Sequence, residues 1–355
     1  TATPLDGNGT ANCYIAPNLR TFYSFDATVQ GNGRSTQNVT PKKLSGVEAR
    51  ILWETGSVRN AVIRSAEYSD GRICFETGTV RGNAVIGLFD AAGTCIWSWH
   101  IWAVNYDPLS TARTYSTGAV FMDRNLGAET TSAYDVKTKG LYYQWGRKDP
   151  FIYPASNKKT DNDEPAAVIS LEGYELKAYG YNTSGISPEN FYTIRWSIEH
   201  PTVMMVGNPN ASSWQTPLNP NLWGNYTDGT NASTINRKTI YDPCPPGWRV
   251  PHTGAWDKTY FKKATYIDDG GWYMYYSTNG SATTFYPFSG YLDGGSNKFQ
   301  YYWPAYQVRA WTNTPNLGVS KDYGQYLYIL DESGVVAITN SARLDQGIVV
   351  RCIRE

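Results

Sequence analysis

The stretch at residues 241–251, Tyr-Asp-Pro-Cys-Pro-Pro-Gly-Trp-Arg-Val-Pro, constrains the fold of this chain more than any other. Proline fixes φ near −65° and moves the residue before it toward extended geometry, so Asp242, Cys244, Pro245 and Val250 are biased away from helix. Ordering so restricted a backbone costs little conformational entropy. We therefore predict a rigid, irregular turn that other segments pack around. A direct contact of this turn with a ligand is the alternative.

The overall charge argues against whole-chain attraction to nucleic acid or to an anionic membrane. Lys and Arg number 31, as do Asp and Glu, so the net field is close to zero. Charged residues make up only 17% of the chain, whereas 28 Tyr, 13 Trp and 33 Gly are present. This balance favours an extracellular β or loop-rich protein over a helical cytosolic one. The length of 355 residues predicts about two domains.

Targeting signals are not visible in the sequence. No apolar run approaches the ~20 residues that span a bilayer. Because no signal peptide is present, we expect Thr1 to be the start of a trimmed chain. Any membrane attachment is then expected through a lipid anchor absent from this chain.

Residues 1–106 alternate apolar and polar side chains with the period of two that is typical of half-buried strands. Such short segments, separated by Gly, Asn and Asp, predict a β-sandwich of immunoglobulin-like type. The segment at 95–104 is the most apolar, and we expect it to be a central strand. The predicted strands are residues 11–16, 23–29, 47–54, 61–68, 72–77, 84–89 and 95–104.

Five cysteines give an odd count, so at least one thiol is free or pairs with another chain. Cys13, Cys74 and Cys95 each lie inside a predicted strand, where a small apolar thiol packs well. We expect all three to be buried and reduced, with a disulfide as the alternative. The sequence contains no Cys-x-x-Cys pair, which argues against a structural zinc site.

Residues 107–355 predict an α+β domain with an antiparallel sheet. Thr253 is placed to cap a helix that carries Trp256, Tyr260 and Phe261 at helical spacing. The predicted strands are residues 120–126, 286–292, 307–314, 326–330, 335–339 and 347–353.

Residues 150–240 show little periodicity. Structureless stretches of this length are often functional. The notable aromatic residues of this stretch are Trp196, Trp214, Trp223 and Tyr226, of which Trp214 and Trp223 are candidate ligand-binding residues. The alternative is a surface loop packed on its own aromatic side chains.

Four ordered motifs in this second part resemble the Fibrobacter succinogenes major paralogous domain, which is common in Bacteroidetes surface proteins. They are Phe-Met-Asp-Arg-Asn-Leu-Gly at 121–127, Gly-Leu-Tyr-Tyr-Gln-Trp-Gly-Arg at 140–147, Asp-Pro-Cys-Pro-Pro-Gly-Trp-Arg-Val-Pro at 242–251 and Val-Arg-Cys at 350–352. The resemblance implies a C-type-lectin-like fold whose first and last strands lie together. The first part is similar to the β-sandwich that precedes this module in fimbrillin-like adhesins, through Asn-Cys-Tyr-Ile at 12–15 and Trp-Ser-Trp-His-Ile-Trp at 97–102.

The resemblance also implies a disulfide between Cys244 and Cys352, because both cysteines stand in the matching motifs. Closing a loop of about 100 residues is worth roughly 4 to 5 kcal/mol in the chain-entropy model. The chain departs from the family pattern at 252–256, His-Thr-Gly-Ala-Trp, where a glutamate is usual before the tryptophan. Any contact made by that glutamate is not expected here.

Catalysis has little support in the sequence, and we expect a protein that is not an enzyme. His100, His200 and His252 lie outside any Gly-x-Ser-x-Gly or His-Glu-x-x-His motif, so we expect structural or surface roles for them. The similar formylglycine-generating enzymes use cysteine chemistry, but the two cysteines of this module are assigned to its framework. A glycosidase needs two carboxylates across one bond, and sequence positions alone do not establish that geometry.

We expect neither a metal nor a cofactor. The acidic groups at 161–164 and 268–269 lack the register of a calcium loop, so we interpret them as solvated loops. The Glu-Pro-Asn and Gln-Pro-Asp triplets of calcium-dependent lectins are absent from the sequence.

The expected ligand-binding residues follow from the resemblance, which places 293–306 where lectin-like folds carry their long binding loop. Aromatic faces suit sugar CH groups or a protein hot spot. The alternative is that these rings fill the core. The candidates in this segment are Asp293, Asn297, Tyr301, Tyr302, Trp303 and Tyr306.

The sequence thus predicts an adhesin of the cell surface or a pilus-tip subunit, located at the outer membrane or fimbrium. Its partners are expected to be an extracellular glycan or protein, with other pilus subunits as a further possibility. A structural pilin that works by assembly and a carbohydrate-active enzyme are the competing interpretations.

Overall fold

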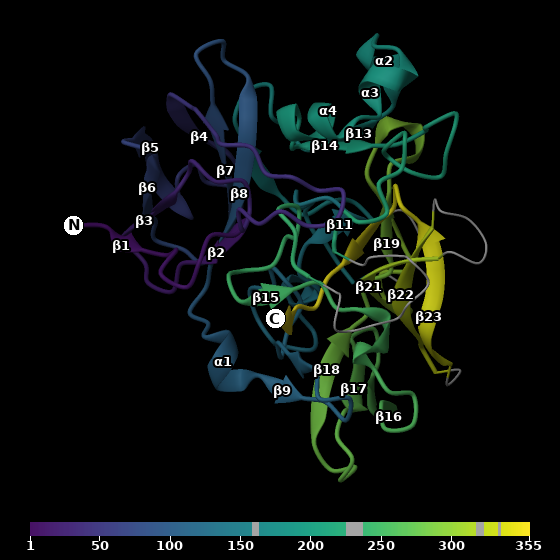
Figure 1. The fold of residues 1–355 in the computed structure, drawn as a ribbon. Coiled ribbons are helices and arrows are strands. Elements are labelled where there is room, and N and C mark those ends of the chain that lie inside the picture. Colours follow the sequence, from purple (N-terminus) through teal and green to yellow (C-terminus); the bar gives the residue numbers. More distant parts are fainter. Residues whose placement is uncertain (158–162, 225–236, 317–322, 333–334) are drawn as a thin grey trace.

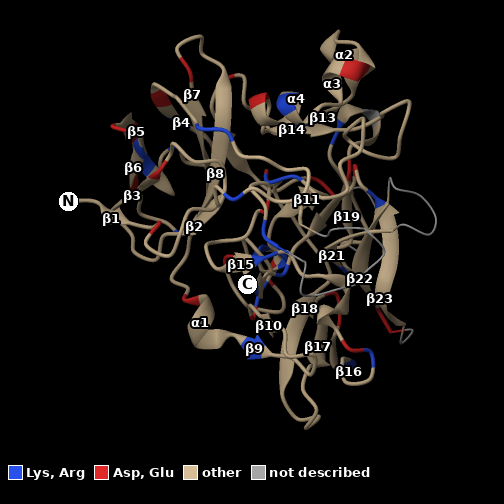
Figure 2. Cartoon of the chain, in the orientation of Figure 1, with Lys and Arg blue, Asp and Glu red and all other residues tan. Residues whose placement is uncertain are grey.

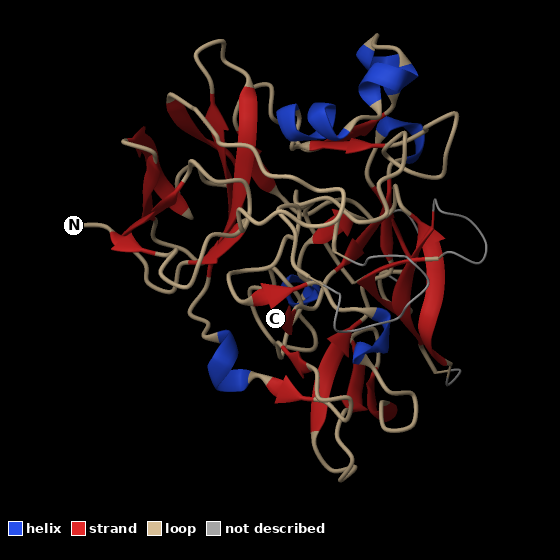
Figure 3. Cartoon of the chain, viewed as in Figure 1, coloured by secondary structure: helices blue, strands red, loops and turns tan. Residues whose placement is uncertain are grey.

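The computed structural model describes residues 1–157, 163–224, 237–316, 323–332 and 335–355, and the described chain is mainly β. Strands β1 to β8 gather on one side of Figure 1 and strands β19 to β23 on the other. The helices are short and flank the strands (Figure 3). Within the described residues, none of them is long and apolar enough to cross a membrane. The β-rich class expected from the sequence is confirmed.

Two sheets make up the first part, as a sandwich-like arrangement requires. All seven predicted strands are present, and their order in each sheet follows from the hydrogen-bonded pairs. One sheet is β1 (Thr3–Pro4), β3 (Phe22–Asp26), β6 (Arg72–Thr77) and β5 (Ile63–Ser69). The other is β12 (Val168–Ser170), β4 (Glu48–Thr55), β7 (Gly82–Phe89), β8 (Cys95–Ala103) and β2 (Cys13–Ile15).

Aromatic side chains from the two sheets form the core between them. The Phe25 ring of β3 lies 5.2 Å from the Trp99 ring of β8 and 4.8 Å from the Tyr14 ring of β2. All three are buried. Alternation therefore identified both the strands and the faces that pack, because one face of each strand must leave water.

Strand β8 is central, as expected, with β7 on one side and β2 on the other. Ser98 and His100, which the alternation places on its other face, are also buried. The second part covers that face: Lys148 Nζ donates to Ser98 Oγ at 2.6 Å, and Ser98 Oγ donates to Asp149 at 3.0 Å. The sandwich is thus packed against the rest of the chain.

Strand β12 links the two parts of the chain directly. Although it belongs to the sequence expected to form the second domain, Val168–Ser170 pairs antiparallel with the end of β4. Two flanking bonds extend the ladder, from Leu171 N to Leu52 O at 2.8 Å and from Gly56 N to Ala167 O at 3.1 Å. One sheet therefore takes strands from both sides of residue 106.

Where the structure describes it, the second part contains three sheets and a two-stranded pair. The largest runs β20 (Gln300–Tyr302), β19 (Tyr291–Asp293), β24 (Gly347–Val349), β21 (Gln307–Pro315), β22 (Tyr323–Leu330) and β23 (Val336–Arg343), with β11 (Tyr142–Gln144) joined to β24. A second is β15 (Trp248–Arg249), β25 (Ile353–Arg354), β10 (Val120–Phe121) and β9 (Arg113–Thr114). The third is β16 (Lys262–Ile267), β17 (Gly271–Tyr275) and β18 (Thr283–Pro287).

The first and last strands of the second part lie together, as the resemblance implied. Phe121 of β10 pairs with Ile353 of β25. Next to this pair, Arg351 Nε donates to Asn125 Oδ1 at 3.0 Å. The ends of this part are therefore joined by both backbone and side-chain contacts.

The proline-rich turn has the framework role predicted for it. Asp242 accepts hydrogen bonds from Cys244 N at 2.8 Å, Val250 N at 2.9 Å and Lys238 Nζ at 3.0 Å, all of them buried. Cys244 forms a disulfide with Cys352 across a sequence separation of 108, which confirms the expected pairing. The other three cysteines are unpaired, as expected, and Cys13 and Cys95 are buried. The burial expected for Cys74 is wrong, because this residue is partly exposed.

The helix expected after Thr253 is wrong. Only a 3-10 turn, η2 (Thr253–Ala255), forms there. Thr253 Oγ1 donates to Gln325 Oε1 at 2.6 Å and does not cap the turn. Trp256 and Phe261 are buried as expected, but Asp257 closes a turn between them by accepting from Thr259 N at 2.8 Å. The apolar spacing of Trp256 and Phe261 therefore reflects the burial of their rings on either side of a turn, not the period of a helix.

Several element bounds also differ from expectation. The strand predicted at 120–126 is only Val120–Phe121, and the one at 286–292 is divided by a turn that contains Gly290. Residues 150–240 hold short elements: β12, β13 (Lys177–Tyr179), α2 (Tyr181–Ser184), α3 (Pro188–Phe191), α4 (Ile194–Glu199) and β14 (Val203–Met205). The remaining helices are α1 (Pro108–Thr111), η1 (Val136–Lys139) and η3 (Gly295–Asn297).

Candidate functional site

A cluster of tyrosine rings surrounds one arginine on the largest sheet. Tyr291 of β19 and Tyr302 of β20 are cross-strand partners, and their rings stack with centroids 5.1 Å apart. The Arg309 guanidinium of β21 lies 4.3 Å from the Tyr291 ring, 5.0 Å from the Tyr326 ring and 6.0 Å from the Tyr328 ring. We call these five residues the tyrosine box.

The tyrosine box is open to solvent on part of its surface. Tyr291, Tyr302, Arg309 and Tyr328 are partly exposed, whereas Tyr326 is buried beneath them. Burial lowers the pKa of Arg309. Stacked rings beside a cation form a flat, amphipathic surface of the kind that sugar rings and protein hot spots use.

Trp303 directly follows Tyr302 in sequence and is exposed, with 40% of its surface accessible. Its φ is +56°, which is rare for a bulky residue. Tyr306 N and Gln307 N both donate to Trp303 O, at 3.1 and 3.3 Å, and the Trp303 ring contacts the Tyr306 ring edge-on. We call residues 303–306 the Trp303 turn. Such conformations occur disproportionately at binding sites.

Two neighbours hold the Trp303 turn in place. Buried Lys139 donates from Nζ to Pro304 O at 2.7 Å and to Phe288 O at 2.5 Å. Its burial lowers the pKa of Lys139 to about 7. Gly290 has φ +53°, and a Cβ there would meet Tyr302 O at 1.9 Å, so only glycine fits. The exposed turn therefore stands on a rigid base.

Three of the predicted ligand-binding residues are core residues instead. Tyr301 alternates to the inner face of β20, where its hydroxyl donates to Ile152 O. Trp214 and Trp223 are also buried, and their indole N–H groups donate to Trp145 O at 2.8 Å and Tyr241 O at 3.2 Å. All three rings therefore fill the core, as the alternative interpretation held. Tyr226 lies outside the described residues.

The other predicted residues lie around the tyrosine box and the Trp303 turn. Asp293 is partly exposed on β19, two positions after Tyr291, and pairs across the hairpin with Gln300. Asn297 is exposed at the end of η3 with φ +59°. The structure thus brings Tyr302 and Asp293 together on one hairpin, with Trp303 next along the chain.

The sequence does not identify Tyr291, Arg309 and Tyr328 as site residues, because their contact depends on strand order. One sequence signal was available: Arg309 is a charged residue within the apolar strand predicted at 307–314. Arg343 and Asp345 were also missed. They form a salt bridge near Asp293; burial raises the pKa of Asp345, and the Asp293 charge raises it further against the opposing effect of Arg343.

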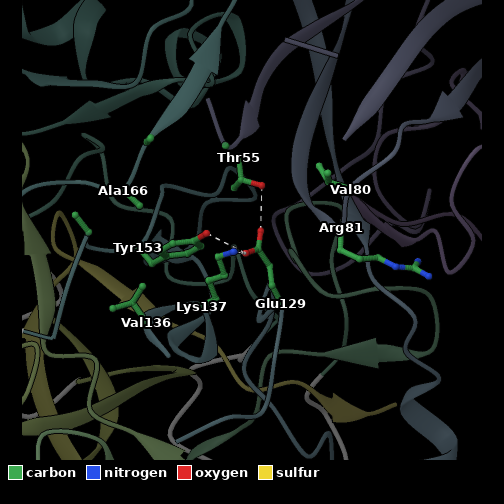
Figure 4. A pocket seen from close by; sticks show the side chains of 11 residues that line it. Thr55, Val80, Arg81, Glu129, Val136, Lys137, Tyr153 and Ala166 are labelled. Carbon is green, nitrogen blue, oxygen red and sulfur yellow. Dashed lines mark hydrogen bonds and ion pairs between the residues drawn. The ribbon is translucent and has the colours of Figure 1, made fainter. Parts of the chain in front are cut away.

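A hollow of about 360 Å³ lies where the two parts meet. Figure 4 shows Glu129 at its centre, with Thr55, Tyr153 and Lys137 directed toward the carboxylate. Glu129 accepts from Thr55 Oγ1 at 3.0 Å, Tyr153 OH at 2.9 Å and Asn83 Nδ2 at 3.3 Å. Burial raises its pKa despite these bonds. Because protein donors occupy the carboxylate, this hollow is better explained as a joint between the two parts than as a ligand site.

The three histidines make contacts within the protein. His100 Nε2 lies 2.7 Å from Asn83 Oδ1, the His200 ring stacks on Trp196 at 3.7 Å, and His252 Nδ1 lies 3.0 Å from Arg249 Nη2. Burial lowers the pKa of all three, to about 3 for His100 and about 4 for His252.

The acidic groups considered for metal binding give no cluster of ligands in the described part of the chain. No group of three or more His, Cys, Asp or Glu side chains there is arranged to hold a metal ion. Asp163 is buried and accepts from Ser156 Oγ at 2.9 Å. Asp161 and Asn162 lie outside the described residues.

Charges of both signs are interspersed over the strands and helices of both parts (Figure 2). The field of the whole chain therefore favours neither cations nor anions.

Comparisons with protein-family models, with curated proteins and with solved structures find no match to this chain.

Proposed function

We propose that this chain is a cell-surface adhesin that binds an extracellular glycan through the tyrosine box and the Trp303 turn. The observation that carries the proposal is the set of partly exposed rings, Tyr291, Tyr302, Tyr328 and Trp303, held on a rigid sheet beside Arg309. Rings fixed by the fold lose little conformational entropy when a ligand stacks on them. Asp293 and Gln300 add hydrogen-bonding groups beside the stacked pair.

The motifs that resemble the Fibrobacter domain support a division of labour in this chain. Cys244 and Cys352 tie two of these motifs together, and Asn125 and Arg351 tie another pair. Residues of these motifs therefore contact one another. Ligand recognition is then left to the segments outside them, which include the tyrosine box.

The pairing of the last strands favours a binding role over assembly by exchange of a C-terminal strand. Strand β24 pairs with β11, β19 and β21, and β25 pairs with β10 and β15. Releasing them would open two sheets. A pilus-tip position remains compatible with this arrangement, because a tip subunit also works by binding.

A glycan and matrix-protein array probed with wild-type protein and with Tyr302→Ala tests the proposal. Loss of the stacked ring is expected to weaken glycan binding by about 10- to 30-fold, the usual cost of removing an aromatic hot spot. Tyr134→Ala is the matched control, because Tyr134 is 74% exposed and lies outside the tyrosine box. Binding to matrix proteins alone, or glycan binding that Tyr302→Ala leaves unchanged, contradicts the proposal.

A further inference from the structure

Arg309 is partly buried and differs in its partners from two other arginines of this chain. Arg147 and Arg343 each pair with a carboxylate, Asp149 at 2.9 Å and Asp345 at 2.5 Å. Buried Arg249 and Arg351 also have no carboxylate partner among the described residues, but Arg351 donates to Asn125 Oδ1 and Phe285 O, and Arg249 donates to Val250 O. Among the described residues, no carboxylate lies within ion-pair distance of Arg309. Within the described ranges its side chain makes one hydrogen bond, from Nε to Gln307 Oε1 at 2.9 Å.

The outer end of the Arg309 guanidinium therefore has donors to offer. An arginine carries five N–H groups, and the four on its two terminal nitrogens form a planar fork. None of these terminal nitrogens is sealed from solvent without a partner, since they do not appear among the buried unpaired atoms of the described residues. A partly buried cation without a counter-ion is costly to maintain. A ligand anion at this position would remove that cost.

We infer that the ligand of the tyrosine box is an anionic saccharide, whose carboxylate or sulfate group is bound by the Arg309 fork while its ring stacks on Tyr302 and Tyr291. This inference rests on the proposed glycan-binding function. Arginine matches carboxylate and sulfate oxygens with two parallel hydrogen bonds, whereas a neutral sugar offers it only single contacts.

The surroundings of Arg309 favour a saccharide over an acidic peptide. The guanidinium lies over ring faces on β19 and β22, so a ligand that reaches it also meets the flat aromatic surface. Tyr302 OH donates to Gln300 Oε1 at 2.9 Å, and Gln300 pairs across the hairpin with Asp293. The polar side chains of Gln300 and Asp293 thus lie beside the stacked rings, where they can form hydrogen bonds with the hydroxyl groups of a sugar that carries one charged substituent.

The test uses pairs of saccharides that differ only in the charged group. The probes are 3′-sialyllactose against lactose, a glucuronate-terminated disaccharide against its glucose counterpart, and a sulfated form of the same neutral sugar. Wild-type protein is expected to bind at least one anionic member about 10-fold or more tightly than its neutral partner. The carboxylate and sulfate arms identify which anion is preferred.

Arg309→Gln is expected to abolish this preference while leaving weak binding to the neutral members, and Arg309→Lys to keep part of it. Because Lys retains the charge, it separates loss of the anion contact from loss of packing. Unfolding curves check that both variants are folded. Arg195→Gln, which removes an exposed cation on α4, is expected to bind as wild type does.

Two results overturn the inference and leave the proposed function standing: equal affinity of wild-type protein for the charged and neutral members, or a preference retained by Arg309→Gln. Binding to none of the saccharides overturns both the inference and the proposed function. The two failures are therefore distinguishable.

Discussion

His100 shows how one buried side chain makes stability depend on pH. It lies on β8 with Nε2 against Asn83 Oδ1, and Nδ1 has no hydrogen-bond partner among the described residues. An amide oxygen accepts, so Nε2 carries the proton and the ring is neutral. Burial lowers the pKa of His100 to about 3, well below the ordinary value of about 6.5.

The sign of the pH effect follows from these two pKa values. Between pH 6.5 and 3 the unfolded chain binds a proton at His100 and the folded chain does not, so stability falls as the pH falls. At pH 5 the expected loss from this residue is about 2 kcal/mol relative to pH 7. Urea unfolding of wild type and His100→Gln at both pH values measures it, because other groups cancel in the difference. Parallel pH dependences in the two proteins contradict the assignment.

At the scale of elements, the proline-rich turn and the closing strand behave as one unit. Asp242 organises the turn from within, and the Cys244–Cys352 bond joins it to the end of the chain, 108 positions later. Such a bond restricts the unfolded chain most when the loop it closes is long. Its contribution of roughly 4 to 5 kcal/mol is therefore a large fraction of the usual domain stability of about 5 to 15 kcal/mol.

Replacing Cys244 and Cys352 together by serine is expected to lower the free energy of unfolding by about 4 to 5 kcal/mol. Equilibrium unfolding in urea under non-reducing conditions measures the change. The control is Cys74→Ser, which alters a cysteine that is not in a disulfide and is expected to cost much less. A double variant that unfolds at the wild-type denaturant concentration contradicts the proposed framework role.

How much of an element could be predicted depends on where its contacts lie. The strands of the first part were predictable because each alternates along its own sequence. The helix after Thr253 was not, since Thr253 bonds Gln325 of a distant strand. Tyr302 and Asp293 were predicted through the resemblance, but Arg309 reaches the ring of Tyr291, the cross-strand partner of Tyr302, only through the strand order β19, β24, β21. No local pattern contains that order.

At the scale of the whole molecule, the two predicted parts are closely joined. Strand β12 completes a sheet of the first part, and Glu129 of the second part accepts bonds from Thr55 and Asn83 of the first. Asn12 Nδ2 donates to Ile240 O at 2.6 Å and to Asp242 O at 2.9 Å, which connects the sandwich to the proline-rich turn. The sandwich therefore supports the framework, and the framework supports the sheet that carries the tyrosine box.

The proline-rich turn is the most restricted stretch of the sequence, yet the proposed ligand contacts lie elsewhere. Its neighbours are the disulfide, the closing strand and the sandwich, and its side chains are mostly buried. The tyrosine box, by contrast, is partly exposed and holds a cation without a carboxylate partner among the described residues. We therefore propose that the proline-rich turn supplies rigidity and that the tyrosine box binds the ligand.

The decisive experiment is a crystal structure of the protein with its tightest-binding saccharide. The sugar ring is expected to lie against Tyr302 and Tyr291, with its charged group within hydrogen-bonding distance of the terminal nitrogens of Arg309. A saccharide bound instead in the hollow beside Glu129, with the tyrosine box unoccupied, would contradict this expectation.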